Sequence, residues 1–135
     1  MKGYVQDIES LATRNVEFRR VLYTAKNSQL VLMALKPKEE IGAEVHKLDQ
    51  FFRVEEGSGD AVLDGVRTAI RAGFAVLVPA GTNHNIINTG TVPMKLYTVY
   101  SPRIIGTASS TIPAPRRKQT TNTSTAKPQN NRKKQ

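Results

Sequence analysis

The stretch from Gly73 to Asn88, GFAVLVPAGTNHNIIN, decides the fold of this chain. Its first part is an apolar run rich in Val, which predicts a short strand that ends at Pro79. The Pro-Ala-Gly sequence that follows predicts a tight turn, and His84 stands at the start of the next apolar run. Two strands joined in this way would hold a histidine, a potential metal ligand, rigidly at the mouth of a β-barrel.

Short apolar segments separated by turn residues make up most of the remaining sequence. Asp64-Gly65, between two alternating runs, is the clearest hairpin signal. One short helix is expected, from an N-cap at Asp7 to about Asn15. The other segments indicate an all-β sandwich or barrel, with strands expected at residues 17–24, 28–36, 50–56, 61–64, 66–71, 74–78, 83–88 and 94–100.

Composition divides the chain into a folded part and a tail. The 135 residues suffice for one domain of about 100 residues. Residues 1–101 carry twelve Lys and Arg and eleven Asp and Glu, whereas residues 102–135 carry eight basic residues and no acidic one. The tail is also poor in apolar residues, so disorder is expected there. The predicted organisation is an N-terminal helical arm (1–16), a β-barrel (17–102) and a basic, low-complexity, disordered tail (103–135).

The composition also limits the kinds of site and the location. There is no cysteine, so any metal must be held by oxygen and nitrogen ligands. The longest apolar runs, residues 30–35 and 74–78, are far shorter than the ~20 residues of a membrane span. The first residues lack the apolar segment of a signal peptide, and we therefore expect a cytoplasmic protein.

The spacing G-x5-P-x-G-x2-H-x3-N in the opening stretch resembles the second motif of the cupin superfamily, with every specified position filled. This resemblance implies a double-stranded β-helix, the jelly-roll barrel of RmlC-like proteins. Residues 38–57 resemble the first cupin motif, G-x5-H-x-H-x3,4-E-x6-G, when Gly57 is its last glycine. That half departs from the pattern, because Glu44 replaces the first histidine, Gln50 replaces the glutamate and Lys38 replaces the first glycine.

The four candidate metal ligands are Glu44, His46, Gln50 and His84. Residues 44, 46, 48 and 50 share one face of an extended chain and so point into the same cavity, where they would meet His84. Two nitrogen and two oxygen donors suit a divalent transition metal, with Mn, Fe, Co, Ni and Zn all compatible. Glu44 could instead belong to an exposed acidic cluster, and Gln50 could simply bond backbone at the barrel rim.

The resemblance extends over residues 4–102 to small bacterial cupins described as mannose-6-phosphate-isomerase-like, in which Gln at the position of Gln50 is usual. After Ser101-Pro102 the chain departs from that group, because residues 103–107 replace a segment that contains histidine. Phe52, Ile86 and Tyr100 are expected to line the pocket, although aromatic residues at such positions also fill barrel cores.

The function expected from these residues is a metal-binding cupin that binds or converts a small molecule, with isomerase-like or dioxygenase-like chemistry and no assigned substrate. Arg53 is out of phase with Gln50, so it should point away from the cavity, and only one of Arg19 and Arg20 can face inward.

The alternative is a non-catalytic cupin. Its tail, with basic clusters at 116–118 and 132–134, would contact nucleic acid or another polyanion without sequence preference, unless it only solubilises the protein. A homodimer is expected, with residues 17–24 as a contributing edge strand.

Overall fold

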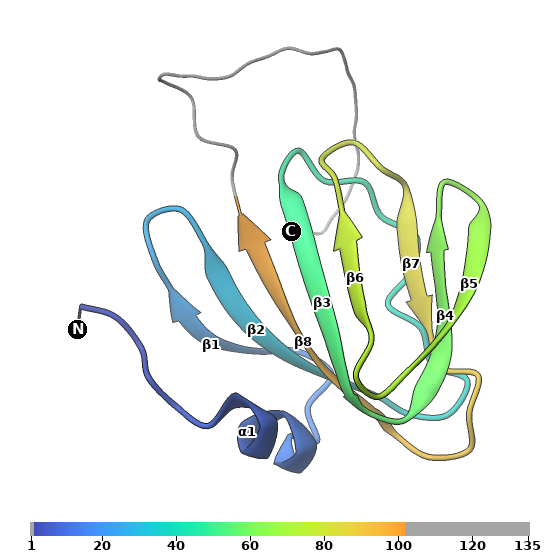
Figure 1. The fold of residues 1–135 in the computed structure, drawn as a ribbon, viewed down its shortest axis with the longest axis horizontal. Coiled ribbons are helices and arrows are strands. Elements are labelled where there is room, and N and C mark those ends of the chain that lie inside the picture. Colours follow the sequence, from blue (N-terminus) through green and yellow to red (C-terminus); the bar gives the residue numbers. More distant parts are fainter. Residues whose placement is uncertain (1, 102–135) are drawn as a thin grey trace.

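Eight β-strands and one short helix make up the part of the chain that the structure describes (Figure 1). The structure is a computed structural model and describes residues 2–101, so the predicted tail at 103–135 lies outside the described residues. The elements are α1 (Ile8–Arg14), β1 (Arg20–Thr24), β2 (Gln29–Leu35), β3 (Asp49–Glu56), β4 (Ser58–Leu63), β5 (Val66–Arg71), β6 (Ala75–Val78), β7 (His84–Ile87) and β8 (Met94–Ser101).

The strands form two antiparallel sheets whose inner faces enclose the core. The larger sheet has the strand order β1-β2-β8-β3-β6, and the smaller one has the order β5-β4-β7. Pairing of strands far apart in sequence, such as β2 with β8 and β4 with β7, produces the jelly-roll connectivity. The predicted all-β cupin barrel with a short N-terminal helix is therefore confirmed.

Alternating side chains along the strands fill the space between the sheets. In β3, residues 50, 52 and 54 are buried while their neighbours are partly exposed, which is the period of a strand with one face toward a core. The core consists of aliphatic, methionine and phenylalanine side chains with little or no exposed surface: Val31, Met33, Leu35, Phe52, Val54, Ala61, Ile70, Val76, Val78, Ile86, Met94 and Leu96.

Two turns illustrate how the local sequence sets these strands. Asp64 and Gly65 both have positive φ, 47° and 83°, as a type I′ hairpin between β4 and β5 requires, and this confirms the predicted hairpin. The strand expected at residues 61–64 begins earlier than predicted, because β4 already starts at Ser58. Gly59 is a strand residue, and this position requires glycine because a Cβ there would collide with the Ile87 carbonyl and the Met94 side chain.

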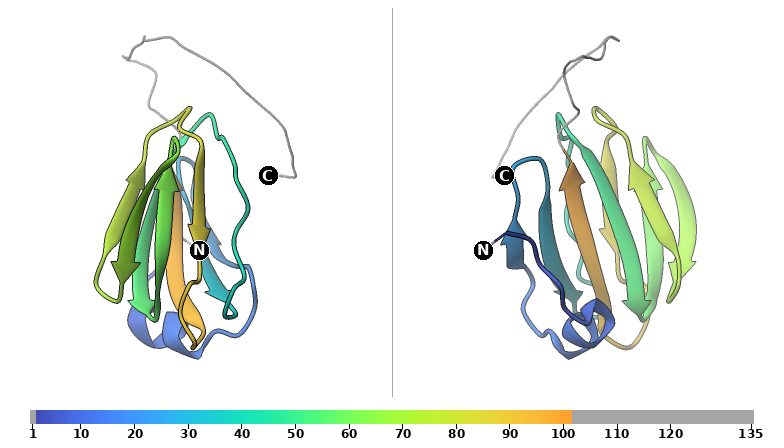
Figure 2. Two further views of the ribbon diagram at one scale, coloured as in Figure 1. Left: turned by 90° about the vertical axis from the view of Figure 1, so that its right-hand side faces the viewer. Right: turned by 60° about the vertical axis from the view of Figure 1, so that its left-hand side comes forward.

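Helix α1 begins and ends where the sequence predicts. Asp7 caps it by accepting a hydrogen bond from the Ser10 amide (3.2 Å), and Asn15 is its C-cap. Ala12 is fully buried, and the Lys95 ammonium, on the outer side of β8, donates to the Asn15 carbonyl. The helix lies at the opposite end of the molecule from the β1–β2 and β6–β7 turns (Figures 1 and 2). Among residues 2–101, no helix has the length and apolarity needed to cross a membrane.

A segment before β3 extends the smaller sheet along β7. The Lys38 amide donates to the Asn88 carbonyl (2.9 Å), and the Ile41 amide donates to the Ile86 carbonyl (3.0 Å). Lys38, which replaces the first glycine of the cupin pattern, has a φ of 71°. Glycine adopts this left-handed conformation more readily than any residue with a Cβ, so Lys38 lies in strained backbone.

Candidate metal centre

The turn between β6 and β7 positions His84. The Thr82 amide donates to the Pro79 carbonyl (3.1 Å), and Gly81 has a φ of 87°, the positive value that a type II turn requires at its third residue. The Gly81 amide donates to the His46 carbonyl (2.8 Å). The turn that precedes one histidine is therefore hydrogen-bonded to the backbone of the other.

Asn88, the last residue of the opening motif, holds the far end of β7. Its amide nitrogen donates to the carbonyls of Leu35 and Val92 (both 2.9 Å), and its amide oxygen accepts from the Gly90 amide (2.8 Å). The side chain is fully buried. Asn88 thus stabilises the turn after β7 and forms no hydrogen bond with the histidines.

Glu44 and His84 face each other across a pair of backbone hydrogen bonds. The Glu44 amide donates to the His84 carbonyl, and the His84 amide donates to the Glu44 carbonyl, both at 2.9 Å. Residues paired in this way in antiparallel strands project their side chains to the same face. The carboxylate of Glu44 is therefore brought beside the His84 imidazole by the backbone itself.

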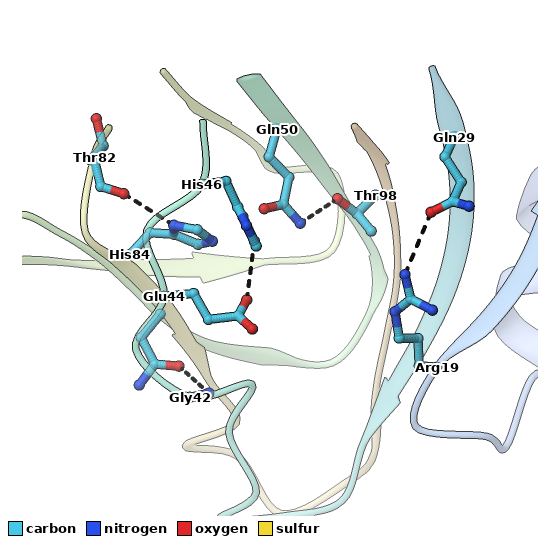
Figure 3. A network of polar contacts seen from close by, with 10 residues as sticks. Arg19, Gln29, Gly42, Glu44, His46, Gln50, Thr82, His84 and Thr98 are labelled. Atoms are coloured by element: carbon cyan, nitrogen blue, oxygen red, sulfur yellow. Dashed lines mark hydrogen bonds and ion pairs between the residues drawn. The ribbon is translucent and has the colours of Figure 1, made fainter. Parts of the chain in front are cut away.

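His46 completes a cluster of three donor groups (Figure 3). Its Nε2 lies 3.3 Å from Glu44 Oε1, and its ring centroid lies 5.3 Å from that of His84. One potential ligand atom from each of Glu44, His46 and His84 lies within 4.8 Å of the other two. This separation allows a single ion to contact all three residues.

Gln50 approaches this cluster from the larger sheet. The residue is 2% exposed, and its Nε2 donates to Thr98 Oγ1 at 2.9 Å. With the amide nitrogen directed to Thr98, the amide oxygen points toward the side of the cluster formed by His46 (Figure 3). Gln50 is therefore held by a side chain of β8 and is not bonded to backbone at the rim.

Three buried polar atoms in this region have no hydrogen-bond partner: His46 Nε2, Gln50 Oε1 and His84 Nε2. Leaving a buried polar atom unpaired costs about 1–3 kcal/mol, so a cluster of three calls for an explanation. A divalent cation would satisfy all three atoms together with the Glu44 carboxylate, since imidazole nitrogen and amide or carboxylate oxygen are suitable ligands. The residues present therefore fit a metal ion.

The electrostatic state of His84 also suits a ligand. Its Nδ1 lies 3.2 Å from the Thr82 carbonyl and donates to it, so the lone pair is on Nε2, which faces the cluster. Burial lowers the pKa of His84, the Thr82 carbonyl and the Glu44 charge oppose that shift, and His46 adds to it. His84 is consequently a neutral imidazole near pH 7, as metal binding requires.

The residues predicted to line the pocket lie at different depths. Tyr100 packs its ring edge against His46 at 5.8 Å between centroids and lines an open pocket. Phe52 and Ile86 have no exposed surface and belong to the core. Each lies two residues further along its strand than Gln50 or His84, and this distance of about 7 Å takes both below the mouth. Phe52, with its ring 6.1 Å from that of His84, supports the site from beneath.

The predicted extended face at residues 44–50 differs from the structure in two respects, whereas Arg53 behaves as expected. Regular pairing of β3 begins only at Asp49, and Leu48 lines the pocket beside Tyr100 without joining Glu44, His46 and Gln50. Arg53 faces away from the site toward Glu55, with 3.8 Å between Arg53 Nε and Glu55 Oε2.

Sequence reasoning missed part of that pocket, which has a volume of about 340 Å³. It lies between the β1–β2 turn, Arg19 and Tyr100. Lys26-Asn27 reads as an ordinary turn, and no local pattern places it near the site. Only the strand register shows that this turn lies near the site, because Gln29 pairs with Tyr100 and Tyr100 pairs with Gln50.

Known proteins are similar to this chain in both sequence and fold. The Cupin domain family matches residues 31–100. Protein YrkC of Bacillus subtilis is 40% identical over 108 residues, and protein L612 of Acanthamoeba polyphaga mimivirus is 40% identical over 104 residues. These alignments cover 75% and 73% of this chain, but only 58% and 65% of the two relatives.

A solved structure supports the same assignment. The crystal structure of BH2720 from Bacillus halodurans superimposes with a TM-score of 0.73 at 40% identity, covering 77% of this chain and 84% of that one. The names of these relatives state no reaction and no substrate. The sequence match over most of the barrel, together with the jelly-roll topology, shows that the chain belongs to the cupin family.

Proposed function

We propose that this cupin binds a divalent transition metal through Glu44, His46 and His84, with Gln50 as a fourth ligand, and uses the site to bind a small molecule. The observation that carries the proposal is the group of three buried atoms without a hydrogen bond, His46 Nε2, Gln50 Oε1 and His84 Nε2, beside the Glu44 carboxylate. Mn, Fe, Co, Ni and Zn are all compatible with this donor set.

One negative protein charge, that of Glu44, would face the ion, because Gln50 contributes a neutral amide. A bound metal would polarise a carbonyl or hydroxyl oxygen of the small molecule. Glu44 and the two histidines would fix the position of the ion, and the Thr98 hydroxyl would keep the Gln50 oxygen turned toward it.

Tyr100 is well placed to donate a hydrogen bond to a ligand. Burial raises the pKa of Tyr100 and Glu44 adds to the increase, whereas the charge of Arg19 and hydrogen bonds with Arg19 and Gln50 oppose it. The hydroxyl therefore remains protonated near neutral pH, where it can donate a hydrogen bond to a ligand oxygen. A neutral donor and a polarising ion suit isomerase-like or dioxygenase-like chemistry, the two reaction classes proposed for this cupin.

Metal analysis of the purified full-length protein tests the proposal. Elemental analysis should find close to one transition-metal ion per chain in the wild type and far less in His84→Ala. Asn83→Ala serves as a matched control, because Asn83 is the exposed neighbour and only its backbone is hydrogen-bonded: its amide donates to Asp64 Oδ1 and its carbonyl accepts from the Asp64 amide. Circular dichroism should show that both variants are folded.

Full metal content in folded His84→Ala would refute the site. If the wild type retains metal, assays of dioxygen consumption and of sugar-phosphate isomerisation test the reaction classes. The absence of turnover in both assays would favour the non-catalytic alternative.

A further inference from the structure

One row of paired residues in the larger sheet runs from the pocket beside Tyr100 to Gln50 at the candidate metal centre. Thr24 pairs with Gln29, Gln29 with Tyr100, Tyr100 with Gln50, and Gln50 with Val78. Directly paired residues project to the same side of a sheet. Since Gln50 and Val78 are buried on the inner face, Tyr100, Gln29 and Thr24 lie on that face too.

The outer end of this row is uncovered. The smaller sheet has only three strands, and the inner position Val21 on β1 is 44% exposed although it pairs with the fully buried Val31. Beyond Tyr100, the inner face of the larger sheet is therefore an open pocket of about 340 Å³, a size suited to a small molecule.

Two cations, Arg19 and Lys26, line this pocket, together with the hydroxyl-bearing Thr24 and Ser28. Among the described residues no carboxylate lines the pocket, and neither cation forms an ion pair. Arg19 has a weak contact with Gln29 Oε1 at 3.5 Å and also interacts with the Tyr100 hydroxyl. It lies on the far side of Gln50 and Thr98 from His46 (Figure 3). The neighbouring Arg20 pairs with Leu32, whose side chain faces the opposite side of the sheet from that of Val31.

We infer that this pocket binds the anionic group, a phosphate or a carboxylate, of the small molecule whose other end reaches the metal centre. The inference rests on the proposed function for the role of that other end. Arg19 offers a planar set of donors, and Lys26 adds a second positive charge from a different element. Tyr100, which contacts both the pocket and His46, would lie between the two ends of the ligand.

Titration of the full-length, metal-free protein with inorganic phosphate and, separately, with acetate tests this inference by ¹H–¹⁵N NMR. Saturable shifts are expected at the amides of residues 24–29 and Tyr100 with at least one of the two anions. The anion that gives them identifies the group. Arg19→Gln and Lys26→Gln should each weaken binding about tenfold, the loss expected for a charge-assisted contact.

Arg20→Gln is the matched control, since it removes the same charge from the outer face of the same region. It should change the affinity less than about twofold, a loss typical of a distant surface charge. The inference is overturned if neither anion gives saturable shifts at residues 24–29 or if Arg20→Gln weakens binding as much as Arg19→Gln. Because this titration needs no metal, it can fail while the metal analysis of His84→Ala succeeds, and the reverse also holds.

Discussion

Replacing Gln50 by Glu should have opposite effects on the metal-free and metal-bound protein. Gln50 is 2% exposed and faces the cluster that contains Glu44, so the substitution places a second carboxylate in a buried position beside that cluster (Figure 3). Thr98 can still donate its hydroxyl proton to the new side chain, so the contact with β8 is retained. The remaining cost is burial of a charge beside a like charge, and we expect the metal-free protein to lose about 1–3 kcal/mol of stability.

A bound cation should reverse part of this loss. The new carboxylate is a stronger ligand than an amide, and we expect the metal dissociation constant to fall about tenfold, equivalent to ~1.4 kcal/mol. Metal at 100 times the wild-type dissociation constant stabilises the wild type by about 2.7 kcal/mol, and the same concentration would stabilise Gln50→Glu by about 4.1 kcal/mol.

Urea denaturation with and without Mn²⁺ or Zn²⁺ measures both effects. The control is Gln50→Met, which preserves side-chain volume without an oxygen donor and should bind metal more weakly than the wild type. The reasoning would be refuted if Gln50→Glu lost the same stability with and without metal and its metal affinity were unchanged, because Gln50 would then not face the ion.

Three further predictions concern the chain without ligand. Since burial lowers the pKa of His84 below its ordinary value of 6.5, the unfolded state takes up this proton more readily. The contribution of His84 to stability should therefore be constant above about pH 6.5 and fall below it by up to ~1.4 kcal/mol per pH unit. Urea denaturation at several pH values should show that stability depends less steeply on pH in His84→Gln. Asn88→Ala should lower the free energy of unfolding by about 3 kcal/mol through the loss of three hydrogen bonds, one buried and two part-buried, against less than about 0.5 kcal/mol for the exposed control Asn83→Ala. Lys38→Gly should raise the melting temperature and add about 0.5–1 kcal/mol by relieving the left-handed backbone, whereas Lys36→Gly, at a position without positive φ, should be destabilising; an equal response of both lysines would contradict the strain argument.

Most of the fold could be predicted because its signals are local. Alternation in β3 and the positive-φ pair Asp64-Gly65 both depend on residues adjacent in sequence. The start of β4 could not be read in this way. Gly59 resembles a turn residue on its own, and only the distant Ile87 and Met94 show that it is a strand residue with no room for a side chain.

The candidate site was predictable to a similar extent. His46 and His84 stood at motif positions, but the reciprocal bonds of Glu44 with His84 span forty residues and became visible only in the fold. The depth of Phe52 and Ile86 could not be predicted either, because the sequence gives the face on which a residue lies but not how far the opposite sheet extends over it. Arg19 illustrates the same difficulty, since the sequence allowed either it or Arg20 to face inward.

The row of paired residues from Val78 to Thr24 gives the larger sheet the character of a molecular ruler. Adjacent strands are about 4.8 Å apart, so Gln50 and Gln29, two strands apart, have backbones separated by about 10 Å. Backbone hydrogen bonding fixes this span independently of the turns at the ends of the strands. If one ligand spans the pocket and the metal centre, as inferred above, a change in the β1–β2 turn would alter which chemical group binds in the pocket. The length of the ligand that fits would stay the same.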